Sequence, residues 1–196
     1  MSTAMPEPCD LGFRPLTVET WADFERLFGP HGCGRCWCMW WRTSRREFAE
    51  GQLNDGAGNR EALHRLVDRG QEPGIMAYCQ QRAIGWCSVC PREQLAALNR
   101  SRVLRPLDDE PVWSIVCFYV ARDWRGMGVA RALLDASVDH VRSRGGTFVE
   151  AYPSVPKGGR APSGSSYMGT PRMFLEAGFV ACAQPSPSKL VLRRRV

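Results

Sequence analysis

Residues 112–120 read VWSIVCFYV, residues 121–130 read ARDWRGMGVA, and residues 131–144 read RALLDASVDHVRSR. The first segment is apolar, aromatic and β-branched, which predicts a buried strand over 112–120. From the end of the second segment onward, apolar residues recur at helical spacing and predict a helix over 126–144, which Gly145 and Gly146 end. Two further glycines therefore lie where the strand becomes the helix.

The turn between this strand and helix, residues 125–130, has the features of an anion-binding site. The first N–H groups of a helix have no intrahelical partner, and the helix dipole is positive at that end. Gly126 and Gly128 let a ligand approach the main chain closely. We therefore expect the turn to bind a phosphate or a pyrophosphate.

The composition is that of one globular domain, with 196 residues, 44% of them hydrophobic and 23% charged. We expect a single domain over 1–196, in which 1–10 form a loose lead-in. The sequence has no apolar run of about 18 residues, so no transmembrane helix is predicted. The first residues, MSTAMPEPCD, lack the basic and apolar regions of a secretory signal. A cytoplasmic protein without a membrane partner is expected.

The formal net charge is +6, and nearly all basic residues are arginine. Such an excess is typical of GC-rich genes, although it can also favour a polyanionic partner. Nucleic acid would need a basic face, and the sequence clusters its arginines only at 193–195. We expect no nucleic-acid partner.

Along the whole chain, the predicted element order is β-α-α-β-β-β-α-β-α-β-β. Residues 74–79 and 83–90 predict a hairpin, and a strand over 147–152 completes a βαβ crossover with the opening stretch. This order predicts a mixed sheet with helices on its faces, an α/β or α+β fold. Residues 153–167 are rich in Pro, Gly and Ser and predict a mobile loop, which is either functional or a plain insertion.

The stretch HGCGRCWCMWW, residues 31–41, has the most unusual composition. It carries four residues of types that bind zinc: His31, Cys33, Cys36 and Cys38. Structural zinc sites commonly use two separated ligand pairs, and the one other C-x₂-C pair, at 87–90, lies in a predicted strand. A C-x₂-C redox pair is a second alternative, although the flanking pattern is not thioredoxin-like.

We favour a packing role for this stretch, in which its tryptophans line a core or a pocket. The nine cysteines are an odd number in a chain without a secretory signal, so we expect free and mostly buried thiols. His64 lies off the apolar stripe of a helix predicted over 61–69 and is interpreted as an edge histidine.

Two motifs resemble the GNAT superfamily of N-acetyltransferases. The pattern R-x-x-G-x-A, formed by Arg125, Gly128 and Ala130, follows an apolar strand and is similar to that family's Q/R-x-x-G-x-G/A motif for acetyl-CoA. Leu175-Glu-Ala-Gly-Phe179 resembles the later helix that ends in Gly-Phe. The resemblance covers about 112–183 and implies a mixed, mostly antiparallel central sheet of about seven strands flanked by helices.

The resemblance also implies a binding mode for acetyl-CoA. The end of the first strand would pair with the pantetheine arm through Phe118, Tyr119 and Val120. The turn would bind the pyrophosphate through Arg125, Gly126, Met127, Gly128, Val129 and Ala130. The implied reaction moves an acetyl group to a primary amine of a small molecule or peptide by direct attack in a ternary complex, without a metal. A non-catalytic acyl-CoA-binding module remains the alternative, and assembly as a homodimer stays open.

The proton donor cannot be carried over from the family. Many members have a tyrosine four residues before the glycine of Gly-Phe, where this chain has Phe174. Tyr167, where asparagine is frequent in the family, is a candidate general acid for the leaving thiolate. Glu150 and Tyr152 are further catalytic candidates. We expect them to face opposite sides of the sheet, with one of them towards the acceptor.

Overall fold

The computed structural model describes residues 9–30, 32–155 and 166–196. Its centre is a seven-stranded sheet in the order β1-β2-β3-β4-β5-β7-β6. The strands are β1 (Leu11–Pro15), β2 (Ile75–Cys79), β3 (Arg82–Pro91), β4 (Trp113–Val120), β5 (Phe148–Ala151), β6 (Val180–Ser186) and β7 (Lys189–Arg195). The helices are α1 (Trp21–Phe28), α2 (Gly32–Arg35), α3 (Arg45–Gly51), α4 (Leu53–Asp68), α5 (Ala96–Asn99), α6 (Val129–Ser143) and α7 (Pro171–Glu176).

The strand pairing confirms the predicted fold class. Only β4 and β5 run parallel, and the other five strand pairs are antiparallel. The predicted strand–turn–helix–strand unit is present as β4, α6 and β5. Helix α6 carries the chain back to the end of the sheet where β4 begins, so β5 can lie parallel beside β4. The sheet is thus mixed and mostly antiparallel, as expected.

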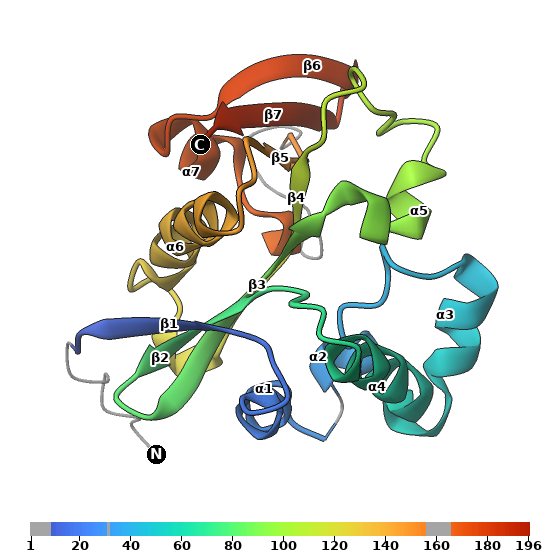
Figure 1. Cartoon of the computed structure of the whole chain (residues 1–196), viewed down its shortest axis with the longest axis vertical. Helices are drawn as coiled ribbons and strands as arrows, with labels where there is room; N and C mark the ends of the chain where they lie inside the picture. The colour runs from blue at the N-terminus through green and yellow to red at the C-terminus, as the bar shows by residue number, and fades with distance from the viewer. Residues whose placement is uncertain (1–8, 31, 156–165) are drawn as a thin grey trace.

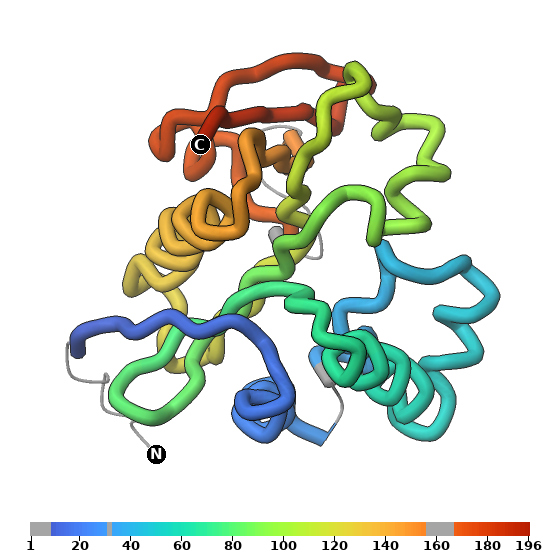
Figure 2. Tube along the Cα trace, viewed as in Figure 1, coloured from blue at the N-terminus to red at the C-terminus, as the bar shows by residue number. Residues whose placement is uncertain are grey.

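Helices cover both faces of the sheet (Figure 1). The long amphipathic helix α6 and the short helix α7 bury Leu133, Val138 and Phe174 in one core on one face. Helix α1 and the segments around α2 to α4 pack a second, aromatic core against the other face, centred on Trp86 and Phe24. Figure 2 shows these two groups on opposite sides of the central strands.

A β-bulge interrupts β4 at its middle. The register with β3 shifts between Ser88 and Val89, so that Val116 has no counterpart. Ile115 and Phe118 therefore both belong to the core under α6, whereas Cys117 packs against the core on the other face. The bulge therefore decides on which face of the sheet each side chain after Val116 lies.

The expectation of nine free cysteines is wrong for two of them. Cys9 and Cys79 form a disulfide with their Cα atoms 5.9 Å apart. They meet because β1 and β2 pair in register, with Leu11 opposite Cys79, which brings the residues before β1 to the end of β2. The other seven cysteines are free, as predicted, but only three of them are buried rather than most: Cys38, Cys87 and Cys90.

Two predicted segments are covered only in part. Residues 1–8 of the expected lead-in and 156–165 of the expected loop lie outside the described residues. At the start of that loop, the Val155 N–H donates to the Ser188 carbonyl oxygen at 3.0 Å, so the first loop residues lie beside β7. In the part of the chain that the structure describes, no helix has the length and apolar character to span a membrane.

Candidate active site

The sheet opens between β4 and β5. Their pairing ends at Ile115 opposite Ala151, while β4 continues to Val120. Among the residues that the structure describes, no strand therefore lies beside β4 over 116–120 on that side. A short 3-10 helix, η3 (Ser166–Met168), lies against β4. An extended ligand could pair with this free edge as a short additional strand.

The predicted anion-binding turn lies directly beyond the free edge. Gly126 and Gly128 have φ of 80° and 79°, a left-handed conformation that favours glycine. Among the described residues, no backbone carbonyl accepts from the N–H groups of 126–130. Gly128 is the N-cap of α6 and supplies no side chain to cap it. The turn thus presents unpartnered N–H groups at the positive end of a 15-residue helix.

Arg125 joins the turn to the strand. Its Nε donates to the Val120 carbonyl oxygen at 3.0 Å. The bond spans the five residues between the end of β4 and the turn. The residues predicted to bind the pantetheine arm and those predicted to bind the pyrophosphate consequently lie at one end of the sheet.

Tyr167 lies in η3, next to the free edge. It is 37% exposed. Burial raises the pKa of its hydroxyl above the ordinary value, and the neighbouring thiols of Cys117 and Cys36 raise it further. The hydroxyl is therefore protonated at neutral pH and able to donate a proton.

Three thiols reach this region from the segment after α1. Burial raises the pKa of Cys33 and of Cys36 to about 11 in each case. Cys38 is buried, and its sulfur accepts from Trp86 Nε1 at 3.0 Å. The backbone here is strained, with φ of 52° at Cys33, 45° at Trp37 and 54° at Cys38.

The zinc interpretation of this segment gains nothing from the geometry. No group of three or more His, Cys, Asp or Glu side chains in the described ranges is placed to hold a metal ion. His31 lies outside those ranges. Trp37 is 3% exposed and packs in the aromatic core, whereas Trp40 is 43% exposed. Trp37 therefore lines a core, as predicted, whereas Trp40 and Trp41 line a pocket on the surface.

The expectation that Glu150 and Tyr152 face opposite sides of the sheet is wrong. The Tyr152 hydroxyl donates to Glu150 Oε2 at 2.7 Å, because residues two apart along a strand share a face. Glu150 is 1% exposed, and Arg193 donates to its Oε1 from Nε at 3.0 Å and from Nη2 at 2.7 Å. Arg92 donates from Nη1 to the Tyr152 hydroxyl at 2.7 Å. Both carboxylate oxygens are thus occupied within a buried ionic network.

Phe174 and His64 are both placed by local packing, and His64 also has Asp68 beside it. Phe174 is fully buried, with its ring 6.1 Å from that of Phe118 and 5.2 Å from that of Phe179. The ring of His64 lies 4.4 Å from that of Trp21, and its Nδ1 is 3.3 Å from Asp68 Oδ2. The interpretation of His64 as an edge histidine agrees with its half-exposed position.

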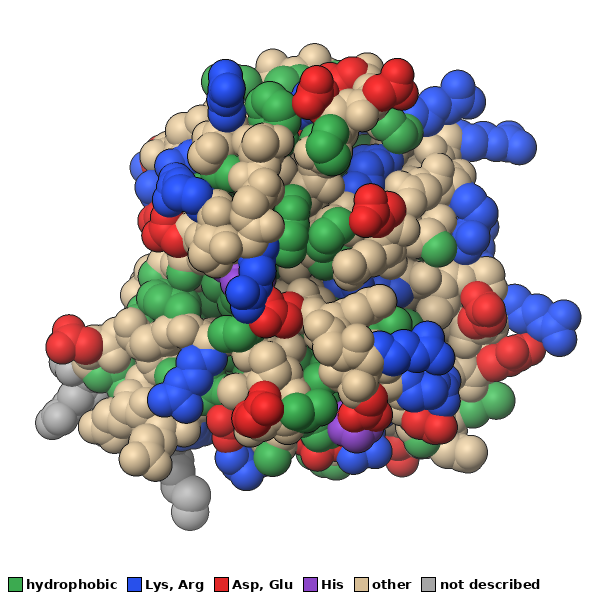
Figure 3. All heavy atoms as spheres, viewed as in Figure 1, with side chains coloured by type: hydrophobic (Ala, Val, Ile, Leu, Met, Phe, Trp, Pro, Cys, Tyr) green, Lys and Arg blue, Asp and Glu red, His purple; other side chains and the backbone are tan. Residues whose placement is uncertain are grey.

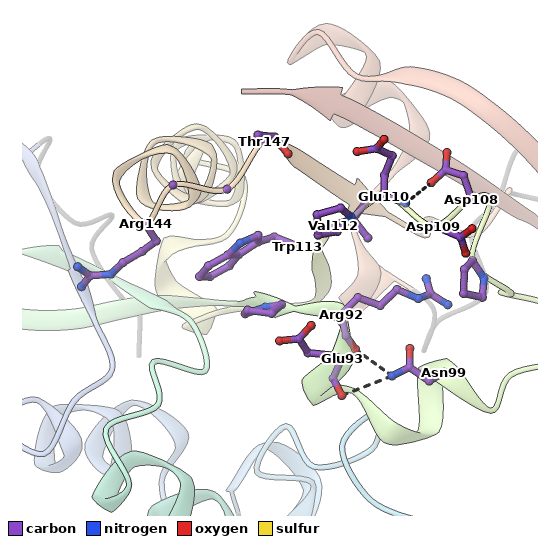
Figure 4. A pocket seen from close by; sticks show the side chains of 15 residues that line it. Arg92, Glu93, Asn99, Asp108, Asp109, Glu110, Val112, Trp113, Arg144 and Thr147 are labelled. Atoms are coloured by element: carbon purple, nitrogen blue, oxygen red, sulfur yellow. Dashed lines mark hydrogen bonds between the residues drawn. The ribbon is translucent and has the colours of Figure 1, made fainter.

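A large cavity of about 740 Å³ lies elsewhere, at the amino ends of β4 and β5. Figure 4 shows Trp113, Arg144 and Thr147 on one side of it and Arg92 and Glu93 on another. These residues are distant from the turn at 125–130, because β4 leads away from the cavity to the turn and α6 leads back from the turn to the cavity. The volume of a cavity alone therefore does not identify the candidate active site.

Sequence reasoning missed Cys117 at the candidate site, and it named Tyr119 only for its main chain. Both side chains pack on the face of β4 opposite the core under α6. Within an unbroken apolar run, nothing distinguished Cys117 from core residues. Only the bulge at Val116 reverses the alternation, and its sequence signal is absent.

Comparisons with known proteins converge on one fold. A model of the acetyltransferase (GNAT) family matches residues 32–157. No curated protein matches the chain. Among solved structures, a ribosomal-protein-alanine N-acetyltransferase from Brucella melitensis is 18% identical with a TM-score of 0.54, covering 94% of this chain and 99% of that one.

Two further structures agree with these matches. The PaiA N-acetyltransferase from Thermoplasma acidophilum, in complex with coenzyme A, is 12% identical with a TM-score of 0.54, covering 95% of this chain and 99% of that one. A GNAT-family acetyltransferase from Streptococcus agalactiae is 12% identical with the same TM-score of 0.54, covering 95% of each chain. At these identities the likeness establishes the fold.

Proposed function

Since this chain belongs to the GNAT family of acetyltransferases, we propose that it moves an acetyl group from acetyl-CoA to a primary amine. The acceptor would be a small molecule or a peptide, and the amine would attack the thioester directly in a ternary complex. Family membership supports acyl transfer in general. The donor and the acceptor class are the proposed part.

The observation that carries the proposal is the free edge of β4 next to the unpartnered N–H groups of the turn. Residues 118–120 would bind the pantetheine arm through main-chain groups, and 125–130 would bind the pyrophosphate. Gly126 and Gly128 fit this role, because nothing lies within 4 Å of where a Cβ would stand at either. Acetyl-CoA, when bound, supplies the activated acyl group.

The chemistry asks two things of the protein. The acceptor ammonium must lose a proton, because an alkylamine has a pKa of about 10.4. The leaving thiolate must gain one, and the protonated Tyr167 beside the free edge is the proposed donor. Glu150 is withdrawn as the proposed base, since Arg193 and Tyr152 occupy its oxygens.

The proposed acceptor class rests on relatives. Two of the structural neighbours are named N-acetyltransferases, which favours an amine here. The alternative, an acyl-CoA-binding module without turnover, is favoured by one observation: Phe174 stands where many family members have their tyrosine. The enzyme and the binding module would both bind acyl-CoA through the same main-chain groups, those of 118–120 and 125–130.

One experiment separates the two. Calorimetry measures coenzyme A binding, and a thiol-release assay with a panel of alkyl, aryl and peptide amines measures turnover. Binding with amine-dependent thiol release is the expected result. Binding without release on any amine supports the module instead, and the absence of binding contradicts both proposals.

We also propose one domain over 1–196, a cytoplasmic location and no nucleic-acid partner. The sheet supports one domain, because its strands come from Leu11 through to Arg195. A single unfolding transition monitored by two probes would agree with one domain. Light scattering would decide between a monomer and a homodimer.

A further inference from the structure

A second large cavity, of about 670 Å³, lies between α3 and α5, on the side of the molecule away from α6. We name it the tryptophan pocket. Its principal lining residues are Trp40, Trp41, Phe48, Arg45, Arg100 and Arg102. The volume falls within the range of about 300–1,000 Å³ that is usual for small-molecule sites. No step of the proposed acyl transfer uses this pocket.

The apolar wall of the tryptophan pocket consists of aromatic rings. The Trp40 ring lies edge-to-face on Phe48 with the ring centroids 5.1 Å apart, and on Trp41 with the centroids 6.5 Å apart. Trp40 is nevertheless 43% exposed, and Val103 on the rim is 46% exposed. Rings fixed at right angles offer both a face and an edge to a further ring.

The two sides of the pocket are joined by a main-chain bond. The Ala97 N–H donates to the Trp41 carbonyl oxygen at 3.0 Å, which ties α5 to the segment before α3. The indole Nε1 of Trp41 is buried and has no hydrogen-bond partner in the described part of the chain. Because this nitrogen is buried, Trp41 offers a ligand in the pocket its ring and not a hydrogen bond.

The charges of the tryptophan pocket are all of one sign. Arg45, Arg100 and Arg102 line it, and no acidic residue does. None of the three forms a salt bridge with a carboxylate of the described ranges. The nearby Glu47 already accepts from the Ser44 N–H at 2.8 Å to cap α3. Figure 3 shows basic side chains projecting along the edge of the molecule that α3 and α5 form.

The cavity of Figure 4 makes a useful contrast. Charged side chains of both signs line it: Arg92 and Arg144 on the one hand, and Glu93, Asp108, Asp109 and Glu110 on the other. An anion would therefore meet carboxylates in that cavity. In the tryptophan pocket the charged lining residues are all basic, and Glu47, which interacts with Arg100, offsets their charge only in part, so an anion would be attracted there.

We propose that the tryptophan pocket binds a small aromatic ligand that carries an anionic oxygen group. The ring of the ligand packs among Trp40, Trp41 and Phe48. The anionic group binds the guanidinium groups at the rim, whose planar forks match a carboxylate or a phosphate. Both groups share this chemistry, and the experiment below distinguishes them.

The test measures binding by calorimetry with three probes of similar shape. Indole-3-acetate carries a carboxylate, indol-3-yl phosphate carries a phosphate, and indole-3-ethanol is neutral. We expect at least one anionic probe to bind at least about tenfold more tightly than the neutral alcohol, because charge-assisted hydrogen bonds are the strong ones. The tighter of the two anions identifies the preferred group. Added salt should weaken the binding of both.

Variants locate the site. The double variant R100Q/R102Q should weaken the anionic probe about tenfold. The matched control R69Q/R105Q removes the same charge from exposed arginines that do not line the pocket, and it should leave binding unchanged. Trp40→Ala should weaken binding, and Trp40→Phe should retain most of it. Circular dichroism checks that each variant is folded.

Three results would overturn the proposal. They are no binding of either anion up to millimolar concentration, equal binding of indole-3-ethanol, and an equal loss in R69Q/R105Q. The proposal does not rest on acyl transfer, since these measurements need no acetyl-CoA.

Discussion

At the scale of single residues, the left-handed glycines before α6 separate two effects of substitution. Nothing crowds a side chain at Gly128, but its φ of 79° strains any residue other than glycine. Gly145, after α6, has φ of 75° and equally open surroundings. The two positions have the same backbone strain, but they lie at opposite ends of α6. Only Gly128 belongs to the proposed pyrophosphate site.

Gly128→Ala and Gly145→Ala should therefore lower the free energy of unfolding by a similar amount, about 1 kcal/mol. Only Gly128→Ala should also weaken coenzyme A binding. Urea unfolding and calorimetry measure the two quantities. Equal coenzyme A affinity in both variants would contradict the proposed position of the pyrophosphate.

Tyr167→Phe should lower kcat about a hundredfold, as expected for loss of a general acid. The affinity for coenzyme A should hardly change, since the proposed cofactor contacts are main-chain groups. In the native protein the acid is active while protonated, so its contribution falls as pH rises through the raised pKa of Tyr167. Steady-state rates across pH test this. A variant that keeps more than a third of the native kcat would exclude Tyr167 as the donor.

At the scale of elements, the network around Glu150 joins β5 to β7. Glu150 and Arg193 are register partners on these strands, and Arg193 also donates to Asp108 in the loop before β4. Arg92, after β3, adds a contact through Tyr152. The network therefore links four parts of the chain: β5, β7, the loop before β4 and the segment after β3.

Glu150→Gln leaves Arg92 with a neutral partner in a buried place and leaves Arg193 with Asp108 as its charged partner. We expect a loss of about 3–5 kcal/mol of stability, the usual effect of breaking a buried pair. Asp108→Asn, at the exposed end of the network, should cost far less. Urea unfolding measures both. If Glu150→Gln instead abolished turnover at unchanged stability, Glu150 would be a catalytic base after all.

His140 links the last turn of α6 to the segment before β2. Burial lowers its pKa, Glu72 opposes the shift and Arg144 adds to it. Trp113 packs against it with ring centroids 5.9 Å apart. A histidine whose folded pKa is depressed stabilises the fold above its unfolded pKa, about 6.5, and that stability is lost as pH falls.

The free energy of unfolding should accordingly decline below pH of about 6.5. His140→Gln should flatten that decline, whereas His64→Gln, at a half-exposed histidine, should not. Urea titrations at a series of pH values test the difference. Parallel declines in the native protein and in His140→Gln would remove His140 as the cause.

At the scale of the whole molecule, the local features were predictable and the distant contacts were not. The turn at 125–130 and the strand before it are contiguous in sequence, so periodicity and two glycines sufficed to locate them. The fold class followed from the element order. The Cys9–Cys79 pairing, the bulge at Val116 and the arginines around Glu150 depend on residues far apart in the chain. The tryptophan pocket is formed by two segments that are far apart in the chain, 40–48 and 97–103, as its lining shows.

Hydrogen exchange of the whole chain should distinguish the two proposed sites. Coenzyme A should protect peptides that cover 116–130 and leave those of α3 and α5 unchanged. An anionic aromatic probe should do the reverse, because its ligands are the side chains of the tryptophan pocket. Protection of both regions by one ligand would mean that the sites are coupled or the assignments wrong.

The short contact between β4 and β5 has a mechanical consequence. Three residue pairs, from Trp113 opposite Val149 to Ile115 opposite Ala151, hold the two halves of the sheet together along this line. The sheet therefore consists of two halves joined by a short strand pairing, and we expect bending motions to concentrate at that pairing. A ligand that pairs with β4 over 116–120 would extend the pairing. The loaded protein should resist shear and thermal breathing better than the empty one.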